Sequence, residues 1–330
     1  MSQLSLFDAD PEPDAQPTSH SGLEAVYAEA RGIAARLPAG VHFGTSSWSF
    51  PGWAGIVYSG TASQARLARE GLREYAKHPL LTTVGIDRGY YAPIPEDDLS
   101  RYAEQLPPGF RCCTKAPASV TSAVLFGRHR SQRPEPNPDF LNPDRFVDEM
   151  LAPFARTFRD RSGPFILECA PTPRDMPVDA TFFAEALDHM LSRLPREFDY
   201  SVELRDRRLL TPEYGRVLAR WRTAHVCNYW TAMPMPGAQA EVVPLDTAAA
   251  VVVRLLLGPG TRYEERRAEF SPFDRLVAPD ETMRRDVVDL VLRSATLGRP
   301  VFVLVNNKAE GSAPLTIRDL ARRVADARSR

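Results

Sequence analysis

Five charged side chains stand at or just after the ends of short apolar stretches in this 330-residue sequence: Lys115, Glu168, Glu203, Arg205 and Arg254. A pair of neighbouring carboxylates is the usual equipment for general acid and base catalysis, and arginine and lysine hold carboxylate or phosphate groups through charge-assisted hydrogen bonds. We therefore take Glu168, Glu203 and Lys115 as candidate catalytic residues. Arg205 and Arg254 are candidates for holding an anionic substrate.

Lys115, in the sequence CCTKAP, allows three interpretations. It could form an ion pair with Glu168 or Glu203 and have no further role. It could clamp an anion, or it could act as an amine nucleophile that forms a Schiff base. We favour the clamp, because a nucleophilic amine needs a desolvated site that the sequence does not indicate.

Further polar and aromatic residues end the same stretches, and such side chains bind substrates by hydrogen bonding or by stacking on a sugar or base. The candidate substrate-binding residues are Ser46, Trp48, Asp87, Tyr90, Arg205, Asp206, Asn228, Arg254, Asn306 and Asn307. For the aromatic residues of the segment SSWSFPGW, ordinary loop packing is the alternative interpretation.

The stretch SVELRDRR shows why the charged residues are informative. Side chains alternate between the two faces of a strand, so Glu203 and Arg205 share one face, and Val202 and Leu204 share the other. If the apolar face packs on helices, the charged pair lies inside the fold, where charges are costly unless paired or bound to a ligand. This favours a functional site, and an internal Glu–Arg salt bridge is the alternative.

The elements that position these residues repeat eight times. Short apolar or β-branched runs occur at 41–45, 81–86, 110–114, 165–167, 200–204, 224–228, 250–255 and 301–305. Segments with helical periodicity separate most of them, at about 62–77, 96–105, 143–160, 179–194, 212–222, 280–297 and 314–327. Alternating strands and helices predict an α/β fold with a parallel sheet, and eight repeats predict a (β/α)₈ TIM barrel whose strand ends meet at one rim.

An open, doubly wound sheet has the same alternation, but the G-x-G-x-x-G motif of such folds is absent after the first run, where GTSSW leads into an aromatic loop. We therefore favour the barrel. We expect three parts: a flexible tail at 1–20, an N-terminal helix packed on the barrel at 21–38, and a single barrel domain at 39–330. The tail is expected to be disordered because it is rich in acidic residues and proline.

Composition narrows the function classes. The net charge of −1 provides no global field to hold nucleic acid or a membrane surface, so any such contact must be local. The sequence has no C-x-x-C pair, no leader-like N-terminus and no apolar run near the length of about 20 residues that a membrane span needs, so we expect a cytoplasmic protein. Its six histidines lack the H-x-x-x-H and H-E-x-x-H spacings, so no metal and no cofactor is predicted.

A separate signal lies in the tail, where the pentapeptide QLSLF resembles the short peptide with which bacterial polymerases and repair proteins dock on the DNA sliding clamp. Its candidate partner-binding residues are Gln3, Leu4, Leu6 and Phe7. A polar glutamine beside apolar anchors on a tether can enter a hydrophobic groove while the barrel stays free. A chance match in the tail is the alternative.

The motifs at the strand ends together resemble the YecE-like family of barrel proteins, also called domain of unknown function 72. The matching pieces are GTSSWSFPGW, TKAP, VELR, VVVRL and VNNKAEGSAP, and the likeness covers most of residues 41–315. The resemblance implies a TIM barrel with a pocket at its rim, and it implies no particular reaction.

The chain departs from that family pattern at the rim. Gly85 replaces the usual glutamate and Asp87 the asparagine of the second strand, while Glu168 stands in place of a glutamine. Asp206 and Glu310 stand where the family often has histidine, and RLLLG replaces RLHG. We interpret the chain as a divergent member.

Three functions remain open. The first is a metal-independent enzyme, of hydrolase or lyase type, that acts on an anionic or sugar-containing small molecule. The second is a DNA-metabolism or repair factor recruited to the sliding clamp, with phosphate contacts from a long loop that carries Arg128, His129, Arg130 and Arg133. The third is a non-catalytic ligand-binding module, because fold alone does not decide function.

Overall fold

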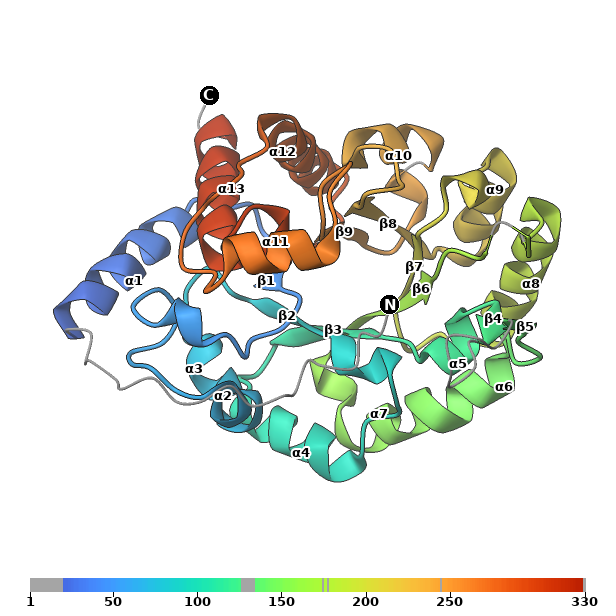
Figure 1. The fold of residues 1–330 in the computed structure, drawn as a ribbon, viewed down its shortest axis with the longest axis horizontal. Helices are drawn as coiled ribbons and strands as arrows, with labels where there is room; N and C mark the ends of the chain where they lie inside the picture. Colours follow the sequence, from blue (N-terminus) through green and yellow to red (C-terminus); the bar gives the residue numbers. More distant parts are fainter. Residues whose placement is uncertain (1–19, 126–133, 174, 177, 244, 329–330) are drawn as a thin grey trace.

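A closed barrel of eight parallel strands forms the centre of the computed structural model, which describes residues 20–328 apart from 126–133, 174, 177 and 244. Neighbouring strands follow the order β1-β10-β9-β8-β7-β6-β3-β2 around the barrel (Figure 1). The strands are β1 (Val41–Thr45), β2 (Thr83–Ile86), β3 (Arg111–Lys115), β6 (Ser162–Cys169), β7 (Tyr200–Leu204), β8 (Ala224–Tyr229), β9 (Val251–Leu255) and β10 (Val301–Val305). The predicted (β/α)₈ TIM barrel is confirmed.

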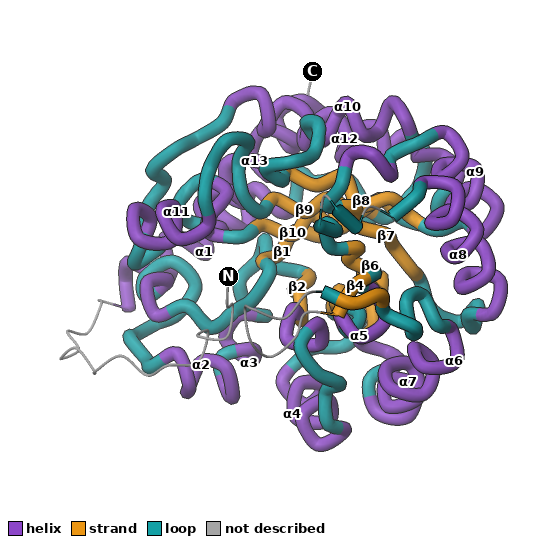
Figure 2. The backbone as a smooth tube through the Cα atoms, turned by 45° about the vertical axis from the view of Figure 1, so that its right-hand side comes forward, coloured by secondary structure: helices purple, strands orange, loops and turns teal. Residues whose placement is uncertain are grey.

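Helices surround the strands as an outer layer (Figure 2). The α-helices are α1 (His20–Ala34), α2 (Gln64–Glu70), α3 (Leu72–Tyr75), α4 (Glu96–Gln105), α5 (Ala118–Thr121), α6 (Pro143–Phe146), α7 (Ala152–Thr157), α8 (Ala180–Arg193), α9 (Pro212–Trp221), α10 (Pro236–Val242), α11 (Tyr263–Phe270), α12 (Glu281–Thr296) and α13 (Ala313–Arg328). Shorter 3₁₀ or π turns are η1 (Pro51–Trp53), η2 (Asp87–Tyr90), η3 (Val147–Leu151), η4 (Arg159–Arg161), η5 (Arg207–Leu209), η6 (Leu245–Thr247) and η7 (Asn307–Ala309).

Several elements differ from the sequence expectation. The run expected at 165–167 is the core of a longer strand, β6, whose first residues include a glycine and a proline that give no apolar signal. The helix α11 was not expected, because its sequence YEERRAEF is too polar to show helical periodicity. A two-stranded antiparallel hairpin, β4 (Val124–Leu125) and β5 (Glu135–Pro136), flanks the basic loop segment, and Arg128, His129, Arg130 and Arg133 lie outside the described residues.

The N-terminal helix α1 joins the outer layer beside α13 (Figure 1). Ala30 and Ile33, on one face of α1, are buried. The Tyr27 hydroxyl donates to the Val57 carbonyl at 2.8 Å, which ties α1 to the loop after β1. Among the described residues no helix has the length and apolarity to cross a membrane.

The hydrophobic core has two parts, because successive strand residues point to opposite faces. The larger part lies between strands and helices. The smaller part fills the barrel interior and includes Cys113, Ile166, Val226, Val252 and Leu304. Two residues further along these strands the side chains again point inward, and there stand Lys115, Glu168, Asn228, Arg254 and Asn306. A polar layer therefore lies directly above the apolar filling of the barrel, at the C-terminal ends of the strands.

Candidate functional site

Five of the predicted residues form one buried ionic network at the barrel mouth. Lys115 Nζ lies 2.8 Å from Glu168 Oε2. Arg205 Nη2 bridges two carboxylates, at 2.5 Å from Glu168 Oε2 and 2.8 Å from Glu203 Oε1. Arg254 Nη1 lies 2.5 Å from Glu203 Oε2 and 3.4 Å from Glu168 Oε2. Strands β3, β6, β7 and β9 thus bring together the residues singled out for their charge.

Asp87 closes the network on the side of β2. Arg254 Nη2 donates to both of its carboxylate oxygens, at 2.9 Å and 2.8 Å. With Asp87 the network holds three cationic and three carboxylate side chains, so its formal charge is zero. The Glu203 and Arg254 side chains are fully buried, whereas the Asp87 side chain is 30% exposed. The network is therefore largely buried, and Asp87 is its most exposed member.

The electrostatics keep Glu168 ionised. Burial by itself favours the protonated carboxyl, but the adjacent cations Arg205, Lys115 and Arg254 outweigh it and hold the pKa of Glu168 well below its usual range. Burial opposes the charge of Arg254 too, and Asp87, Glu203 and Glu168 together raise the pKa of that guanidinium above its ordinary value. Glu168 is thus a carboxylate that can accept a proton or a hydrogen bond.

Two aromatic rings flank the cations of the network. Lys115 Nζ lies 4.4 Å from the centroid of the Tyr90 ring, and the Arg205 guanidinium carbon lies 4.0 Å from the centroid of the Trp230 ring. Both contacts are in the range of cation–π attraction. Tyr90 was predicted from its place after the second strand, but Trp230 was missed. Its only signal in the sequence is its position directly after β8.

Gly85, the residue that replaces the family's glutamate, lets the ends of β1 and β2 approach closely. A Cβ atom at Gly85 would lie 3.0 Å from both the Cα and the carbonyl oxygen of Ser46, closer than ordinary van der Waals contact. The predicted residue Ser46 is buried, and its Oγ makes no hydrogen bond to any residue that the structure describes.

Asn228 lies in the barrel wall with its polar atoms engaged. Its Nδ2 donates to the Leu204 carbonyl at 2.8 Å. Its backbone N–H donates to Gln239 Oε1 at 3.1 Å, and its carbonyl accepts from Gln239 Nε2 at 2.6 Å. Gln239 also contacts His225 Nε2 at 3.0 Å. These contacts fix β8 against α10, so Asn228 supports the mouth.

Two of the predicted substrate-binding residues have other partners. The Trp48 indole is buried, donates to the Leu67 carbonyl at 2.9 Å and packs edge-on against Tyr102, which is the loop-packing alternative. Asp206 caps the turn that follows β7, where it accepts from the Arg208 backbone at 2.9 Å and pairs with the Arg208 guanidinium. The structure shows neither of them in the ionic network.

The end of β10 carries a second polar group of residues. Asn306 Oδ1 accepts from the Lys308 backbone at 3.0 Å, and Asn307 Oδ1 accepts from the Ala313 backbone at 2.8 Å and from the Trp53 indole at 3.3 Å. Asn307 Nδ2 is buried and has no hydrogen-bond partner in the described chain. Lys308, which sequence reasoning passed over although it stands in the motif VNNKAEGSAP, projects from the same turn.

Glu310, where the family often has histidine, serves a buried ion pair away from the network residues. Its carboxylate accepts from Arg284 Nε and Nη2, each at 2.9 Å, and from the Thr316 hydroxyl at 2.8 Å. The Asp280 backbone adds a donor at 2.8 Å, so all the polar contacts of this fully buried carboxylate are made within the fold. Glu310 therefore ties α12 and α13 to the end of β10.

No group of three or more histidine, cysteine, aspartate or glutamate side chains suited to a metal ion occurs among the described residues. The predicted partner-binding residues Gln3, Leu4, Leu6 and Phe7 lie outside the described part of the chain.

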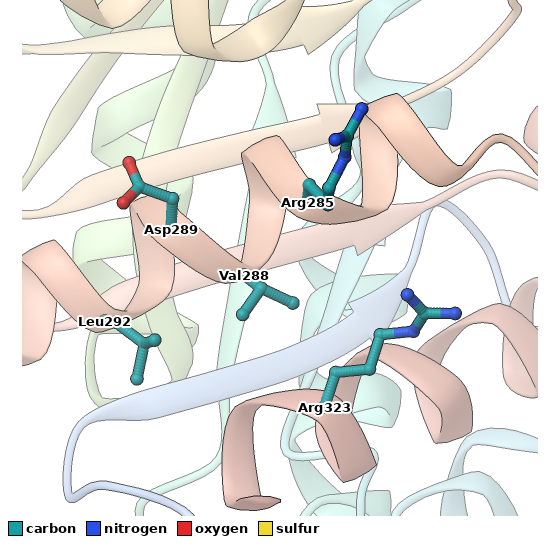
Figure 3. A pocket seen from close by; sticks show the side chains of 5 residues that line it. All are labelled: Arg285, Val288, Asp289, Leu292 and Arg323. Carbon is teal, nitrogen blue, oxygen red and sulfur yellow. The ribbon is translucent and has the colours of Figure 1, made fainter. Parts of the chain in front are cut away.

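Two surface hollows lie elsewhere on the barrel. One, of about 320 Å³, lies between α12 and α13 (Figure 3) and is lined by Arg285, Val288, Asp289, Leu292 and Arg323. The other, of about 670 Å³, is lined in part by Gly40 and Pro300, directly before β1 and β10, so it lies at the end opposite the mouth. None of the candidate site residues lines either hollow.

A parallel eight-stranded barrel with ionisable side chains gathered at the C-terminal strand ends defines a (β/α)₈-barrel protein with a polar mouth. The chain belongs to the family described as protein of unknown function DUF72, whose model matches residues 42–330. This confirms the resemblance that the strand-end motifs indicated.

Relatives and solved structures agree with this family. The UPF0759 protein YecE of Escherichia coli strain K12 is 31% identical over 167 residues, which are 50% of this chain and 48% of that protein, and its counterpart in strain O157:H7 matches equally. The chain thus spans about half the length of these curated relatives. A DUF72 family protein from Thermotoga maritima superposes with a TM-score of 0.57 at 17% identity, covering 85% of this chain and 97% of that one. Another, from Enterococcus faecalis, gives 0.55 at 15% identity, covering 86% and 95%. At such identities the structural likeness concerns the fold.

Proposed function

We propose that this protein is an enzyme that binds an anionic or sugar-containing small molecule at the barrel mouth. The observation that carries the proposal is the ionic network itself, in which Lys115, Glu168 and Arg205 meet within 2.8 Å at the ends of three strands. Six charged side chains placed above the barrel filling are costly to desolvate, and apolar residues would fill that space at least as well. Barrel enzymes place their reactive groups at this end of the strands.

The residues take distinct roles in this proposal. Lys115 and Arg205 hold the anion, because both side chains have some exposure. Each contacts the Glu168 carboxylate, and an anionic group of the substrate could take the place of that carboxylate as their partner. We assign Glu168 as the general base, because it is the glutamate of the pair that keeps some exposure. Its lowered pKa makes it a weak base until an anion takes over the contacts of Lys115 and Arg205. Glu203 was expected to share the proton transfer, but it is fully buried between Arg205 and Arg254, so we assign it and Arg254 to positioning.

The aromatic rings of Tyr90 and Trp230 suit the face of a sugar or another flat group. Each ring already covers a cation of the network, Lys115 and Arg205 respectively. A substrate that is anionic at one end and carries a ring at the other would contact both kinds of group. The chemistry proposed is proton transfer in a hydrolase or lyase reaction, and it requires no metal or cofactor.

A thermal-shift screen of a metabolite collection against the full chain tests this proposal, because a ligand that binds only the folded state raises its stability. The expected result is a hit whose shift is lost in Lys115→Met, and turnover of that hit which is lost in Glu168→Gln. Glu96→Gln, at an exposed ion pair with Arg156, is the matched control. Hits that respond equally in all variants would contradict the site. Binding that persists with no turnover would favour a non-catalytic ligand-binding module.

A second function rests on the sequence match at Gln3, Leu4, Leu6 and Phe7. We propose that this peptide recruits the protein to the bacterial sliding clamp and so to DNA in the cytoplasm. Fluorescence anisotropy with a labelled peptide of residues 1–20 tests the contact, and binding should be lost when Leu6 and Phe7 are both changed to alanine. Equal binding by the altered peptide would end this proposal and would leave the mouth proposal untouched.

A further inference from the structure

Lys308 lies at the mouth, on the turn η7 that directly follows β10. Its backbone is fixed by the Asn306 side chain, which accepts the Lys308 N–H at 3.0 Å. Its Nζ lies 4.4 Å from the centroid of the Tyr263 ring on α11. The side chain is therefore held against one aromatic face between η7 and α11.

This ammonium group makes no ion pair with any residue that the structure describes. The sequence has three lysines, Lys77, Lys115 and Lys308. Lys77 is exposed, and Lys115 pairs with Glu168 at 2.8 Å. Across the described residues no carboxylate lies within 4.0 Å of Lys308 Nζ. A partly buried charge without a counter-ion is costly, so the site favours an anion that the chain itself does not supply.

Arg267 adds a second positive charge, an exposed one, on the helix that carries Tyr263. It stands four residues after Tyr263 on α11, so the two share a helix face. Its neighbours Arg262 and Arg266 pair with Glu265 and Glu269 three residues further on, while Arg267 makes no ion pair with any described residue.

The two cations influence each other. Burial, and then repulsion from Arg267, lower the pKa of Lys308 to about 8, although Asp87 and Glu264 act in the opposite direction. Two cations that repel each other are stabilised when an anion lies between them.

Asp87, a member of the ionic network, makes no ion pair with Lys308 in the described structure. Its carboxylate is bonded to Arg254 at 2.8 Å and acts on Lys308 only from a distance, beyond the range of an ion pair. The network is balanced in charge, whereas the Lys308–Arg267 pair is not. The uncompensated positive charge of the mouth is therefore at the end of β10, where an entering anion would bind.

We propose that Lys308 and Arg267 form an anion subsite that binds the phosphate group of a phosphate monoester. Two cations from different elements match a group that carries a charge of about −2 at neutral pH, and a carboxylate would satisfy only one of them. The proposal rests on the proposed function, since the remainder of such a substrate would lie over the network at Lys115 and Glu168. It adds the substrate class, a phosphorylated small molecule.

Calorimetric titration of the full chain with inorganic phosphate and with methyl phosphate tests the subsite at constant ionic strength set with potassium chloride. We expect both to bind and dimethyl phosphate, which carries one charge, to bind at least about tenfold more weakly. Lys308→Met and Arg267→Met should each weaken phosphate binding about tenfold or more, because each removes a charge-assisted contact. Lys308→Arg should retain most of it, and Lys77→Met, at an exposed lysine, should leave it unchanged.

Binding of phosphate should weaken as the pH rises above about 8, since Lys308 then loses its proton. Absence of phosphate binding by the wild-type chain, or equal binding by Lys308→Met that melts like wild type, overturns the subsite. The two proposals fail separately. If binding of a metabolite requires Lys115 and Glu168 but is unchanged in Lys308→Met, only the subsite is refuted. If phosphate binding depends on Lys308 but no ligand binding or turnover depends on Glu168, only the proposed enzyme function is refuted.

Discussion

Glu168 and Glu203 are register partners on the adjacent strands β6 and β7, and a single nitrogen of Arg205 lies 2.5 Å from one carboxylate and 2.8 Å from the other. Register partners on neighbouring strands point to the same side of the sheet, so two ionised carboxylates here repel each other. Arg205, shared between them, and Arg254, across the barrel, offset that repulsion. The two glutamates therefore depend on the two arginines to occupy neighbouring positions inside the barrel.

We expect Glu203→Gln to destabilise the protein by about 3–5 kcal/mol, because removal of one partner leaves a buried charge without compensation. The groups that lose a carboxylate partner are Arg254, fully buried at 2.5 Å from Glu203, and Arg205, so the network is left with one excess positive charge. Urea unfolding followed by circular dichroism measures the change. The control is Glu24→Gln in the exposed pair with Arg31, which should shift stability by less than about 1 kcal/mol. Equal small changes in both variants would contradict a network held by charge.

Acid should unfold the wild-type protein more steeply than Glu168→Gln. The pKa of Glu168 is lower in the folded protein than its ordinary value of 4.5, so the unfolded chain binds the proton more readily. The stability that Glu168 contributes is present above pH 4.5 and is lost as the pH falls from there towards the folded pKa. Unfolding free energies measured between about pH 3 and 7 give the slope. The same slope in variant and wild type would show that Glu168 is not held ionised.

His225 should remain neutral down to about pH 4. Burial lowers its pKa to about 4, and its ring lies between the Tyr214 hydroxyl at 2.8 Å and Gln239 Oε1 at 3.0 Å. Since the unfolded chain protonates histidine near pH 6.5, stability should fall as the pH decreases from 6.5 towards 4. Ring-proton NMR of the native protein measures the titration, with the urea-unfolded chain as the reference. A native midpoint near 6.5 would refute the prediction.

Gly85→Ala and Gly32→Ala should change stability in opposite directions. At Gly85 the new methyl group would lie 3.0 Å from backbone atoms of Ser46, so we expect a loss of about 1–3 kcal/mol. At Gly32, inside α1, no atom lies within 4 Å, and alanine should stabilise the helix by about 0.5–1 kcal/mol. Denaturant midpoints of the two variants and wild type measure both effects. A tolerated Gly85→Ala would mean that β1 and β2 can separate at the mouth.

The barrel was predictable because its signals are local. Each strand is a short apolar or β-branched run, and β1, β7 and β10 begin and end at the residues that the runs indicate. Alternation along β7 similarly placed Glu203 and Arg205 on one face, as their shared ion pair shows. The helix α11 escaped prediction, because its charged residues carry no apolar periodicity.

The sequence by itself determined which charged residues stand at the ends of strands and that those ends share a rim. Only the tertiary structure decided the pairing: Arg254 of β9 reaches Asp87 at the end of β2, whereas Asp206, two residues beyond the end of β7, turns to Arg208. It also revealed Lys308 beside α11. Periodicity along one strand fixes the face of a side chain, but partners across a closed barrel depend on strand register and closure, which are set by contacts between segments distant in sequence.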